Sequence, residues 1–324
     1  MKALILGGAG FIGLHLTRRL LGEGHSVTIV DDFSRGRNDP ELASVDADVL
    51  HADLTDPACF RDIPHGWDQI YLLAAVVGVR NVDKDPARAI RINTLALLNT
   101  LDWIRPGEHL FFASTSEVYA GGVSAGIVPV PTAETVPLTV DDITAPRYAY
   151  GTSKLLGEAA VIHTGRAKEI PYVIGRFHNV YGPRMGAAHV IPEVALRALR
   201  HEDPFTVFGA DQSRAFCHVD DAVEAVYRLM ADGVGDGRIV HIGNDTEETN
   251  IADLVKLILR VTGHNPVLEY RPAPANSVAR RCPDLTLLRS LTGYVPTVSL
   301  DDGVRHTVDW YARNGQPTDA PLKV

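Results

Sequence analysis

Short apolar runs alternate with longer stretches of helical periodicity through the first half of the chain. Two of the short runs, Ala3–Leu6 and Leu110–Ala113, contain only apolar residues, which is typical of strands buried on both faces of a parallel sheet. We expect strands at Lys2–Leu6, Ser26–Val30, Asp48–His51, Gln69–Leu73, His109–Ala113 and Tyr172–Phe177. The periodic stretches predict helices at Phe11–Gly22, Pro86–Ile104 and Tyr148–Thr164. This alternation predicts an α/β fold with a doubly wound parallel sheet.

The rhythm changes after about residue 178, where prolines become frequent. Helical patterns recur at Val190–Arg200, Asp220–Met230, Ile251–Thr262 and Leu300–Asn314. We interpret residues 1–178 as one domain and residues 179–324 as a smaller α/β domain laid against it. Some segments of the second part are expected to return to the first domain.

The composition is that of an ordinary globular protein, with 45% hydrophobic and 22% charged residues. A formal net charge of -9 disfavours general nucleic-acid binding, so an anionic ligand must be held by local arginines or helix ends. On charge alone the candidate arginines are Arg176, Arg184, Arg214, Arg280 and Arg281. Cys59, Cys217 and Cys282 form no metal-binding or disulfide pattern, and no apolar stretch is long enough for a membrane span. We therefore expect a cytoplasmic protein without a metal, a membrane anchor or a nucleic-acid partner.

A glycine-rich turn follows the first expected strand, with the sequence Gly7-Gly8-Ala9-Gly10-Phe11-Ile12-Gly13. Glycine allows the backbone to bend sharply and to approach a pyrophosphate closely. The amino terminus of the helix that follows offers unpaired N–H groups to the phosphates. The turn therefore predicts a Rossmann-type dinucleotide-binding domain, although a plain tight turn is the alternative.

Acidic residues after the next two strands indicate which dinucleotide binds. Asp31 and Asp32 end the second strand, about twenty residues beyond the turn, where a carboxylate accepts hydrogen bonds from the ribose hydroxyls and repels a 2′-phosphate. NAD is therefore favoured over NADP, with Arg35 and Arg37 nearby leaving the choice open. Asp53 is a candidate for the adenine amino group, and its alternative role is a helix cap.

Tyr150 and Lys154 stand four residues apart on an expected helix, so their side chains share one face. A phenol has an unperturbed pKa of about 10. We expect the Lys154 ammonium to lower the pKa of Tyr150 and so to make it a general base for a sugar hydroxyl. Thr115 follows the fifth strand and is expected to bind the same substrate oxygen, and Glu117 is a second acid or base candidate. A cap at the end of the strand is the alternative role for these two residues.

These residues resemble the extended short-chain dehydrogenase/reductase superfamily along nearly the whole chain. The matching motifs are the glycine turn, Leu73-Ala74-Ala75, Asn93-Thr94, Ser114–Tyr119, Tyr150-x-x-x-Lys154, Arg176–Arg184, Phe216–Asp221 and Ile242-Gly243-Asn244. The resemblance implies a retained NAD and a nucleotide-sugar substrate. The implied cofactor-binding residues are Gly7, Gly10, Phe11, Ile12, Asp31, Asp32, Phe33, Ser34, Gly36, Asp53, Leu54, Leu73, Ala74, Ala75, Asn93, Ser114, Tyr150 and Lys154.

Within the superfamily, three segments resemble UDP-glucuronate decarboxylases: Ser114–Tyr119, Gly182–Met185 and Arg280–Asp284. This resemblance implies oxidation at C4 of the sugar, loss of carbon dioxide and reduction by the stored hydride. It places Thr115, Ser116, Glu117 and Arg281 around the sugar carboxylate, together with the catalytic Tyr150 and Lys154. For the nucleotide part of the substrate, which is expected to be UDP-linked, it implies Asn179, Arg184, Val207, Phe208 and Arg214.

Other features leave alternatives open. Leu73–Val79 and His178-Asn179 resemble sugar 4-epimerases, and the long segment between Tyr119 and Tyr150 can reshape the sugar pocket. A nucleotide-sugar 4-epimerase is therefore the second hypothesis, and a non-catalytic dinucleotide-binding partner protein is a remote third. The resemblance also implies a homodimer formed through the helices at 86–104 and 148–164, although the leucines of the first helix are equally suited to the internal core.

Overall fold

The central feature of the fold is a sheet of seven parallel strands. The computed structural model describes residues 1–34, 39–273 and 277–315. The strands lie in the order β11-β6-β5-β4-β1-β2-β3. Their bounds are β1 Lys2–Leu6, β2 Ser26–Asp31, β3 Asp48–His51, β4 Gln69–Leu72, β5 His109–Thr115, β6 Tyr172–Phe177 and β11 Arg238–Ile242. This sheet confirms the predicted doubly wound α/β fold.

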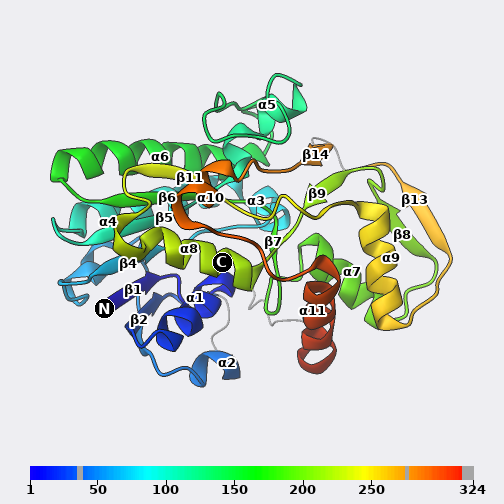
Figure 1. The fold of residues 1–324 in the computed structure, drawn as a ribbon, viewed down its shortest axis with the longest axis horizontal. Coiled ribbons are helices and arrows are strands. Elements are labelled where there is room, and N and C mark those ends of the chain that lie inside the picture. Colours follow the sequence, from blue (N-terminus) through cyan, green and yellow to red (C-terminus); the bar gives the residue numbers. More distant parts are fainter. Residues whose placement is uncertain (35–38, 274–276, 316–324) are drawn as a thin grey trace.

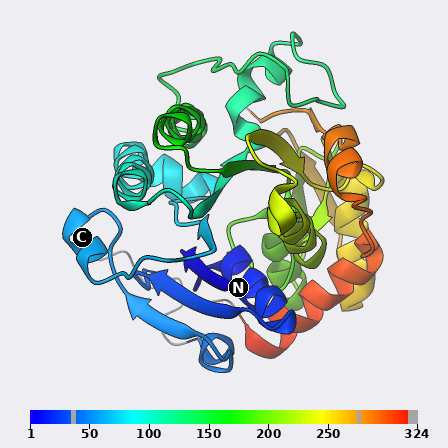
Figure 2. The ribbon, with the colours of Figure 1, turned by 60° about the vertical axis from the view of Figure 1, so that its left-hand side comes forward.

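Helices cover both faces of the sheet (Figures 1 and 2). One layer contains α4 (Pro86–Trp103) and α6 (Tyr148–Lys168), and the other contains α1 (Phe11–Gly22) and α8 (Val219–Met230). The start of α4 shows how local sequence fixes these elements. Asp85 accepts a hydrogen bond from the backbone N–H of Arg88, and Pro86 occupies the first helical position, where no intrahelical donor is needed.

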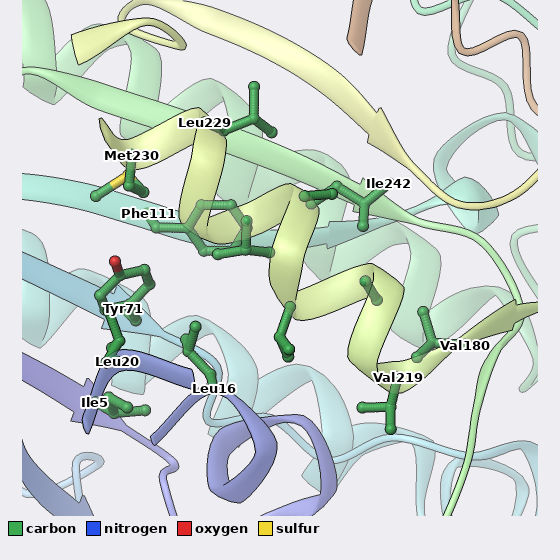
Figure 3. Close-up of a cluster of buried hydrophobic side chains, with 14 of the residues drawn as sticks. Ile5, Leu16, Leu20, Tyr71, Phe111, Val180, Val219, Leu229, Met230 and Ile242 are labelled. Atoms are coloured by element: carbon green, nitrogen blue, oxygen red, sulfur yellow. The ribbon is translucent and has the colours of Figure 1, made fainter. Parts of the chain in front are cut away.

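The strands bury apolar side chains on both faces, because successive side chains point in opposite directions. In β1, Ala3 and Ile5 belong to the core beneath α1 and α8, whereas Leu4 and Leu6 belong to the core beneath α4 and α6. Figure 3 shows the first of these cores, in which side chains from α1 and α8 meet those of the central strands. The wholly apolar runs in the sequence are therefore explained by burial on two sides.

A second group of elements lies beyond the carboxyl ends of the strands, on the right of Figure 1. Its helices are α7 (Val190–Leu199), α9 (Ile251–Thr262) and α11 (Leu300–Asn314), and they share an apolar core with β8. Its strands are β7 Val180–Tyr181, β8 Phe205–Phe208, β9 Ser213–Ala215, β10 Cys217–His218, β12 Glu248–Asn250, β13 Leu268–Arg271 and β14 Arg280–Arg281. They form small separate sheets that do not extend the large one.

Some elements from beyond residue 178 join the first group. Strand β11 pairs with β6 at the edge of the large sheet, and α8 packs against α1. The remaining short elements are α2 Pro40–Ala43, η1 Pro57–Arg61, α3 Val79–Lys84, η2 Ser116–Tyr119, α5 Ala120–Ser124, η3 Ala231–Gly233 and α10 Thr286–Thr292. Within the described ranges, no helix combines the length and apolarity needed to cross a membrane.

Candidate active site

A single large cavity of about 1150 Å³ extends from the glycine turn to Arg281. Its walls come from the carboxyl ends of the parallel strands and from the second group of elements, where doubly wound folds bind their ligands. The volume exceeds the usual 300–1,000 Å³ of a pocket for one small ligand. The cavity is therefore large enough for a dinucleotide and a second nucleotide together.

The glycine turn lies at one end of this cavity, which we call the cofactor end. Gly7 has φ +91, and a Cβ there would stand 2.5 Å from the backbone nitrogen of Ala74. No other residue type fits this conformation and this approach. Helix α1 begins at Phe11, so its first N–H groups face the cavity and can bind a pyrophosphate.

Asp31, at the end of β2, is the main acidic group of the cofactor end. Its carboxylate accepts hydrogen bonds from the backbone N–H of Ala9 at 3.0 Å and of Phe33 at 2.9 Å. Burial raises the pKa of Asp31 to about 6 in spite of these two donors. The turn, the helix end and this carboxylate fit the phosphates and a ribose of NAD.

Most of the other expected cofactor residues line the cavity, but not all of them do. Asp32, Ser34, Asp53, Leu54 and Leu73–Ala75 line the cavity, and Asp53 also caps its own turn by accepting hydrogen bonds from Thr55. Gly36 lies outside the described residues. Ser114 also lines the cavity, and its hydroxyl donates to the buried Glu158.

Asn93 has a role in the structure that the sequence did not indicate. Its side chain accepts a hydrogen bond from the backbone N–H of Val76 at 2.7 Å and donates one to the hydroxyl of Ser153 at 3.1 Å. Asn93 is buried and lies behind the cavity wall. It therefore joins the loop after β4 to the start of α6.

Three residues expected at the substrate lie elsewhere, and these expectations are corrected. Arg184 pairs with Asp39 and donates to the carbonyl oxygen atoms of Ala9 and Gly10, so it lies at the cofactor end. Val207 is packed in the core beneath α9, and the side chain of Phe208 is exposed. Neither Val207 nor Phe208 lines the cavity formed by the described residues.

Tyr150 and Lys154 both project from α6 into the cavity, opposite the end of β5. The hydroxyl of Thr115 lies near that of Tyr150 and acts to lower its pKa. The Lys154 ammonium lies 4.8 Å from the ring centroid of Phe112 and 6.0 Å from that of Tyr150, and burial lowers its pKa to about 8. The expectation for Tyr150 is corrected: burial and the negative charge of Glu117 raise its pKa above the usual value.

Gly151 allows α6 to approach the end of β5 closely. A Cβ at this position would stand 2.9 Å from the carbonyl oxygen of Glu117. A larger residue would push the start of the helix away and separate Tyr150 from Thr115. The glycine after the tyrosine is therefore a packing requirement of the site.

Glu117 and Arg281 occupy the opposite end of the cavity, which we call the sugar end. Arg281 Nη1 donates to Glu117 Oε1, and Arg147 Nη2 donates to Glu117 Oε2 at 3.3 Å. Burial opposes ionisation, but the two guanidinium groups outweigh it and lower the pKa of Glu117 to about 2. Sequence reasoning missed Arg147, although its position three residues before Tyr150 was a signal.

Arg214 and Asn179 also line the cavity. Arg214 donates to the carbonyl oxygen atoms of Ser213 at 2.7 Å and Val278 at 2.5 Å. Burial and the neighbouring Arg281 lower the pKa of its guanidinium to about 10, which leaves it charged at neutral pH. Asn179 donates to the carbonyl oxygen of Ala215 at 3.2 Å.

A buried polar network supports β5 from behind. Arg176, a candidate anion ligand on charge alone, is paired with Glu158 through Nε–Oε1 at 2.8 Å and Nη2–Oε2 at 2.7 Å. It is therefore structural. Next to it, the Tyr119 hydroxyl lies 2.7 Å from His178 Nε2 and 3.3 Å from His241 Nε2. Burial holds the pKa of both imidazoles well below the usual value, so they are neutral.

The segment between Tyr119 and Tyr150 is anchored behind the sugar end. The backbone N–H of Thr132 donates to the carbonyl oxygen of Cys282 at 2.9 Å, and that of Asp284 donates to Thr132 at 2.7 Å. This pairing holds the chain on either side of Arg281. Among the described residues, no group of three or more His, Cys, Asp or Glu side chains is placed to hold a metal ion.

The fold and the cavity define a class of protein, an NAD-dependent α/β enzyme built on a Rossmann-type sheet. Residues 3–243 match the NAD dependent epimerase/dehydratase family. The chain belongs to this family, which confirms the predicted superfamily and cofactor.

Individual relatives agree with this assignment. The UDP-N-acetyl-alpha-D-glucosaminuronate decarboxylase of Bacillus cytotoxicus is 31% identical, over 96% of this chain and 97% of that protein. The UDP-glucuronic acid decarboxylase 1 of Xenopus tropicalis is 31% identical, over 96% of this chain and 72% of that protein. The structure is similar to that of the UDP-glucose 4-epimerase of Thermotoga maritima with UDP-glucose, with a TM-score of 0.84 and 29% identity over 97% of this chain and 99% of that one.

Proposed function

We propose that this protein is an NAD-dependent decarboxylase of a UDP-linked uronic acid, with UDP-glucuronate as the substrate to test first. The observation that carries the proposal is the ionised Glu117 held between Arg281 and Arg147 beside Tyr150. Guanidinium groups are suited to a carboxylate because their planar fork of donors matches it. Two relatives with names of uronate decarboxylases support the same reaction.

The cofactor would be held by the glycine turn, the start of α1 and Asp31, with Asp32 and Asp53 nearby. NAD, when bound, supplies the acceptor for the hydride from C4 of the sugar and the donor for its return. Lys154 would hold the nicotinamide ribose. Asn179 and Arg214 would hold the diphosphate of the substrate, since both line the cavity and Arg214 is charged at neutral pH.

The chain's own residues would move the protons. Tyr150 would accept the proton of the C4 hydroxyl in its phenolate form, which the positive charges of Lys154 and of bound NAD would stabilise against the burial that raises its pKa. Thr115 would orient that oxygen through its hydroxyl. With a ketone at C4, the bond from C5 to the carboxylate breaks, carbon dioxide leaves, and the electron pair is taken up as an enolate whose oxygen Tyr150 protonates. Ser116, Glu117 and Arg281 surround the carboxylate until it leaves. The enol would then gain a proton from solvent at C5 and return its O–H proton to Tyr150. Bound NAD would supply the hydride that reduces the C4 ketone, and Tyr150 would supply the proton to its oxygen.

A nucleotide-sugar 4-epimerase is the second candidate, because the chain is similar in structure to a UDP-glucose 4-epimerase. Both reactions begin with proton removal by Tyr150. They differ in whether carbon dioxide leaves before C4 is reduced again.

The decisive experiment is incubation of the NAD-loaded protein with UDP-glucuronate, followed by mass spectrometry of the nucleotide sugar. We expect a product that has lost carbon dioxide, and no such product from Tyr150→Phe, which should slow turnover by about 100- to 10,000-fold while retaining NAD. A product that keeps its carboxylate and is inverted at C4 would establish the epimerase and exclude the decarboxylase.

We further propose a cytoplasmic homodimer that pairs α4 and α6 with their symmetry mates. What supports the dimer is that Ile90 and Leu98 on α4 and Leu156 on α6 are exposed, whereas Leu101 is buried in the core. Sedimentation analysis, with Leu98→Glu as the disruptive variant, tests this arrangement.

A further inference from the structure

Arg184 links the two groups of elements at the cofactor end of the cavity. It comes shortly after β7 in the second group, and its guanidinium pairs with Asp39, which directly precedes α2 in the first group. The same guanidinium donates to the carbonyl oxygen atoms of Ala9 at 3.2 Å and Gly10 at 3.3 Å. One side chain therefore joins the second group both to the glycine turn and to the start of α2.

The ion pair between Arg184 and Asp39 is largely shielded from water. The side chain of Arg184 is 6% exposed, and that of Asp39 is 16% exposed. Salt weakens an ion pair at such a depth only a little, and removal of one partner leaves the other charge without compensation. This contact is therefore more costly to break than an ion pair at the surface.

The backbone around Arg184 is held on both sides. Arg184 has φ +68, a left-handed conformation that residues other than glycine seldom adopt and that the surrounding structure must maintain. His15 on α1 donates to the carbonyl oxygen of Pro183 at 3.2 Å, and the hydroxyl of Tyr311 on α11 donates to that of Met185. The position of the guanidinium group is therefore fixed by the fold.

A second contact joins the same two groups of elements. Trp310 on α11 donates through Nε1 to Glu41 on α2, and Arg18 on α1 holds the other carboxylate oxygen of Glu41 at 2.7 Å. Helices α2 and α11 both lie at the lower edge of the view in Figure 1. Asp39, Glu41, Arg184 and Trp310 all line the cavity. The two contacts therefore form a wall of the cofactor end to which both groups contribute.

We propose that Arg184, Asp39, Trp310 and Glu41 form a latch that controls how slowly NAD leaves the protein. The hydride that NAD accepts from the sugar must return to the same sugar, so early loss of the reduced cofactor would leave the reaction incomplete. The latch prevents this loss, because its two contacts must break before the two groups of elements can separate at the cofactor end. The inference holds for a decarboxylase and for a 4-epimerase alike, since both reduce the sugar again.

The charges of the latch allow it to be distinguished from simple attraction. The pyrophosphate of NAD is negative, so Arg184 attracts it and Asp39 repels it. If charge alone retained NAD, removal of the Asp39 charge would slow the release of NAD. If the ion pair closes the latch, the same change speeds the release. Asp39→Asn also keeps an acceptor for the backbone N–H of Glu41, so the cap of α2 is preserved.

The test measures how fast NAD dissociates from the protein loaded with radiolabelled NAD, by gel filtration at intervals after addition of excess unlabelled NAD. We expect Asp39→Asn and Arg184→Gln each to release NAD about 10- to 100-fold faster, the range for a hydrogen bond to a charged group. Trp310→Phe keeps an aromatic ring but loses the donor. It should release NAD about 3- to 10-fold faster, because Arg18 still holds Glu41.

Arg197→Gln is the matched control. Arg197 also holds a carboxylate and a carbonyl oxygen, those of Glu202 and Thr206, and its side chain is 16% exposed. It lies outside the cavity that the described residues form. The control should therefore release NAD within about twofold of the rate of the unchanged protein.

The sign of the change in Asp39→Asn decides the outcome. Slower or unchanged release of NAD from this variant would overturn the latch, because slower release indicates attraction by charge and unchanged release indicates that the ion pair does not retain NAD. If thermal unfolding shows that Arg184→Gln does not fold, Asp39→Asn alone decides. No sugar is present in this measurement, so its result is independent of the reaction proposed for the cavity.

Discussion

The two ends of the cavity each present a carboxylate, and the protein shifts their pKa values in opposite directions. At the cofactor end, burial raises the pKa of Asp31 to about 6, although two backbone N–H groups donate to it. At the sugar end, burial also opposes ionisation, but Arg281 and Arg147 lower the pKa of Glu117 to about 2. Backbone dipoles therefore compensate burial only in part, whereas paired guanidinium groups more than compensate it.

This difference matches the ligands that we propose for the two ends. Ribose hydroxyls are neutral donors, and Asp31 gains most of its stabilisation as an anion when they bind. The sugar end carries its compensating charge permanently, so it is prepared for an anionic ligand before that ligand arrives. Changes that affect one end at a time therefore test this comparison.

The largest effect is expected from Glu117→Gln, which keeps the shape of the side chain and removes its charge. Since the pKa of Glu117 is about 2, the group acts as an ionised acceptor at neutral pH and not as a proton donor. We expect kcat for carbon dioxide release to fall about 100-fold, because Arg281 and Arg147 lose the carboxylate that holds their guanidinium groups in place beside the reacting centre. KM for UDP-glucuronate should stay equal or fall, because one competing negative charge is gone.

Steady-state kinetics checks this split between kcat and KM, and the NAD content of the purified variant serves as the control for the cofactor end. A rise in KM with unchanged kcat would show that Glu117 contributes to substrate binding alone. The low pKa of Glu117 would then have no role in catalysis.

A smaller effect, about tenfold, is expected for NAD affinity as the pH is lowered from 7 to 5. The folded-state pKa of Asp31 is raised to about 6, so the apo protein binds a proton there as the pH falls. Ribose hydroxyls donate to the ionised carboxylate, and binding must displace this proton. NAD affinity should therefore be level above about pH 7 and should decrease through pH 6.

Calorimetric titration of the apo protein with NAD at several pH values measures this effect. Asp31→Asn should bind NAD more weakly and lose the pH dependence in this range. If the NAD affinity of Asp31→Asn falls with pH at the same slope, another group titrates in this range. The raised pKa of Asp31 would then not control NAD binding.

The glycine turn and Asp31 at the cofactor end could be predicted from the sequence, because they come from neighbours in the chain. The glycine turn joins β1 to α1, and Asp31 ends the next strand, so their placement follows from the βαβ unit itself.

The helices at Phe11–Gly22, Ile251–Thr262 and Leu300–Asn314 were predicted with the bounds that they have. Amphipathic periodicity determines these bounds locally, together with the side-chain caps Asn250 and Ser299 at the start of the last two helices.

The sugar end could be predicted only in part, because its contacts join segments far apart in the chain. The pairing of Glu117 with Arg281 spans 164 positions, and that with Arg147 spans 30. Strand β11 was missed for a similar reason: Arg238–Ile242 is short, and its place at the sheet edge depends on pairing with β6. Arg184 shows the reverse error, since its ion pair with Asp39 draws it to the cofactor end.

The smallest effect is expected from Ser153→Ala, which weakens the connection between the two ends. The Ser153 hydroxyl donates to the carbonyl oxygen of Tyr150 at 2.7 Å and accepts from Asn93 at 3.1 Å. Its loss should cost about 1 kcal/mol of unfolding free energy, or about 2–4 °C in Tm, with both NAD retention and turnover nearly unchanged. Ser290→Ala, which removes a similar hydroxyl bond to Leu287 on the exposed side of α10, should cost less. Thermal unfolding measures the stability of both variants. A large loss of turnover in Ser153→Ala at unchanged Tm would contradict this prediction, because it would mean that Ser153 acts on the substrate and does not only stabilise the start of α6.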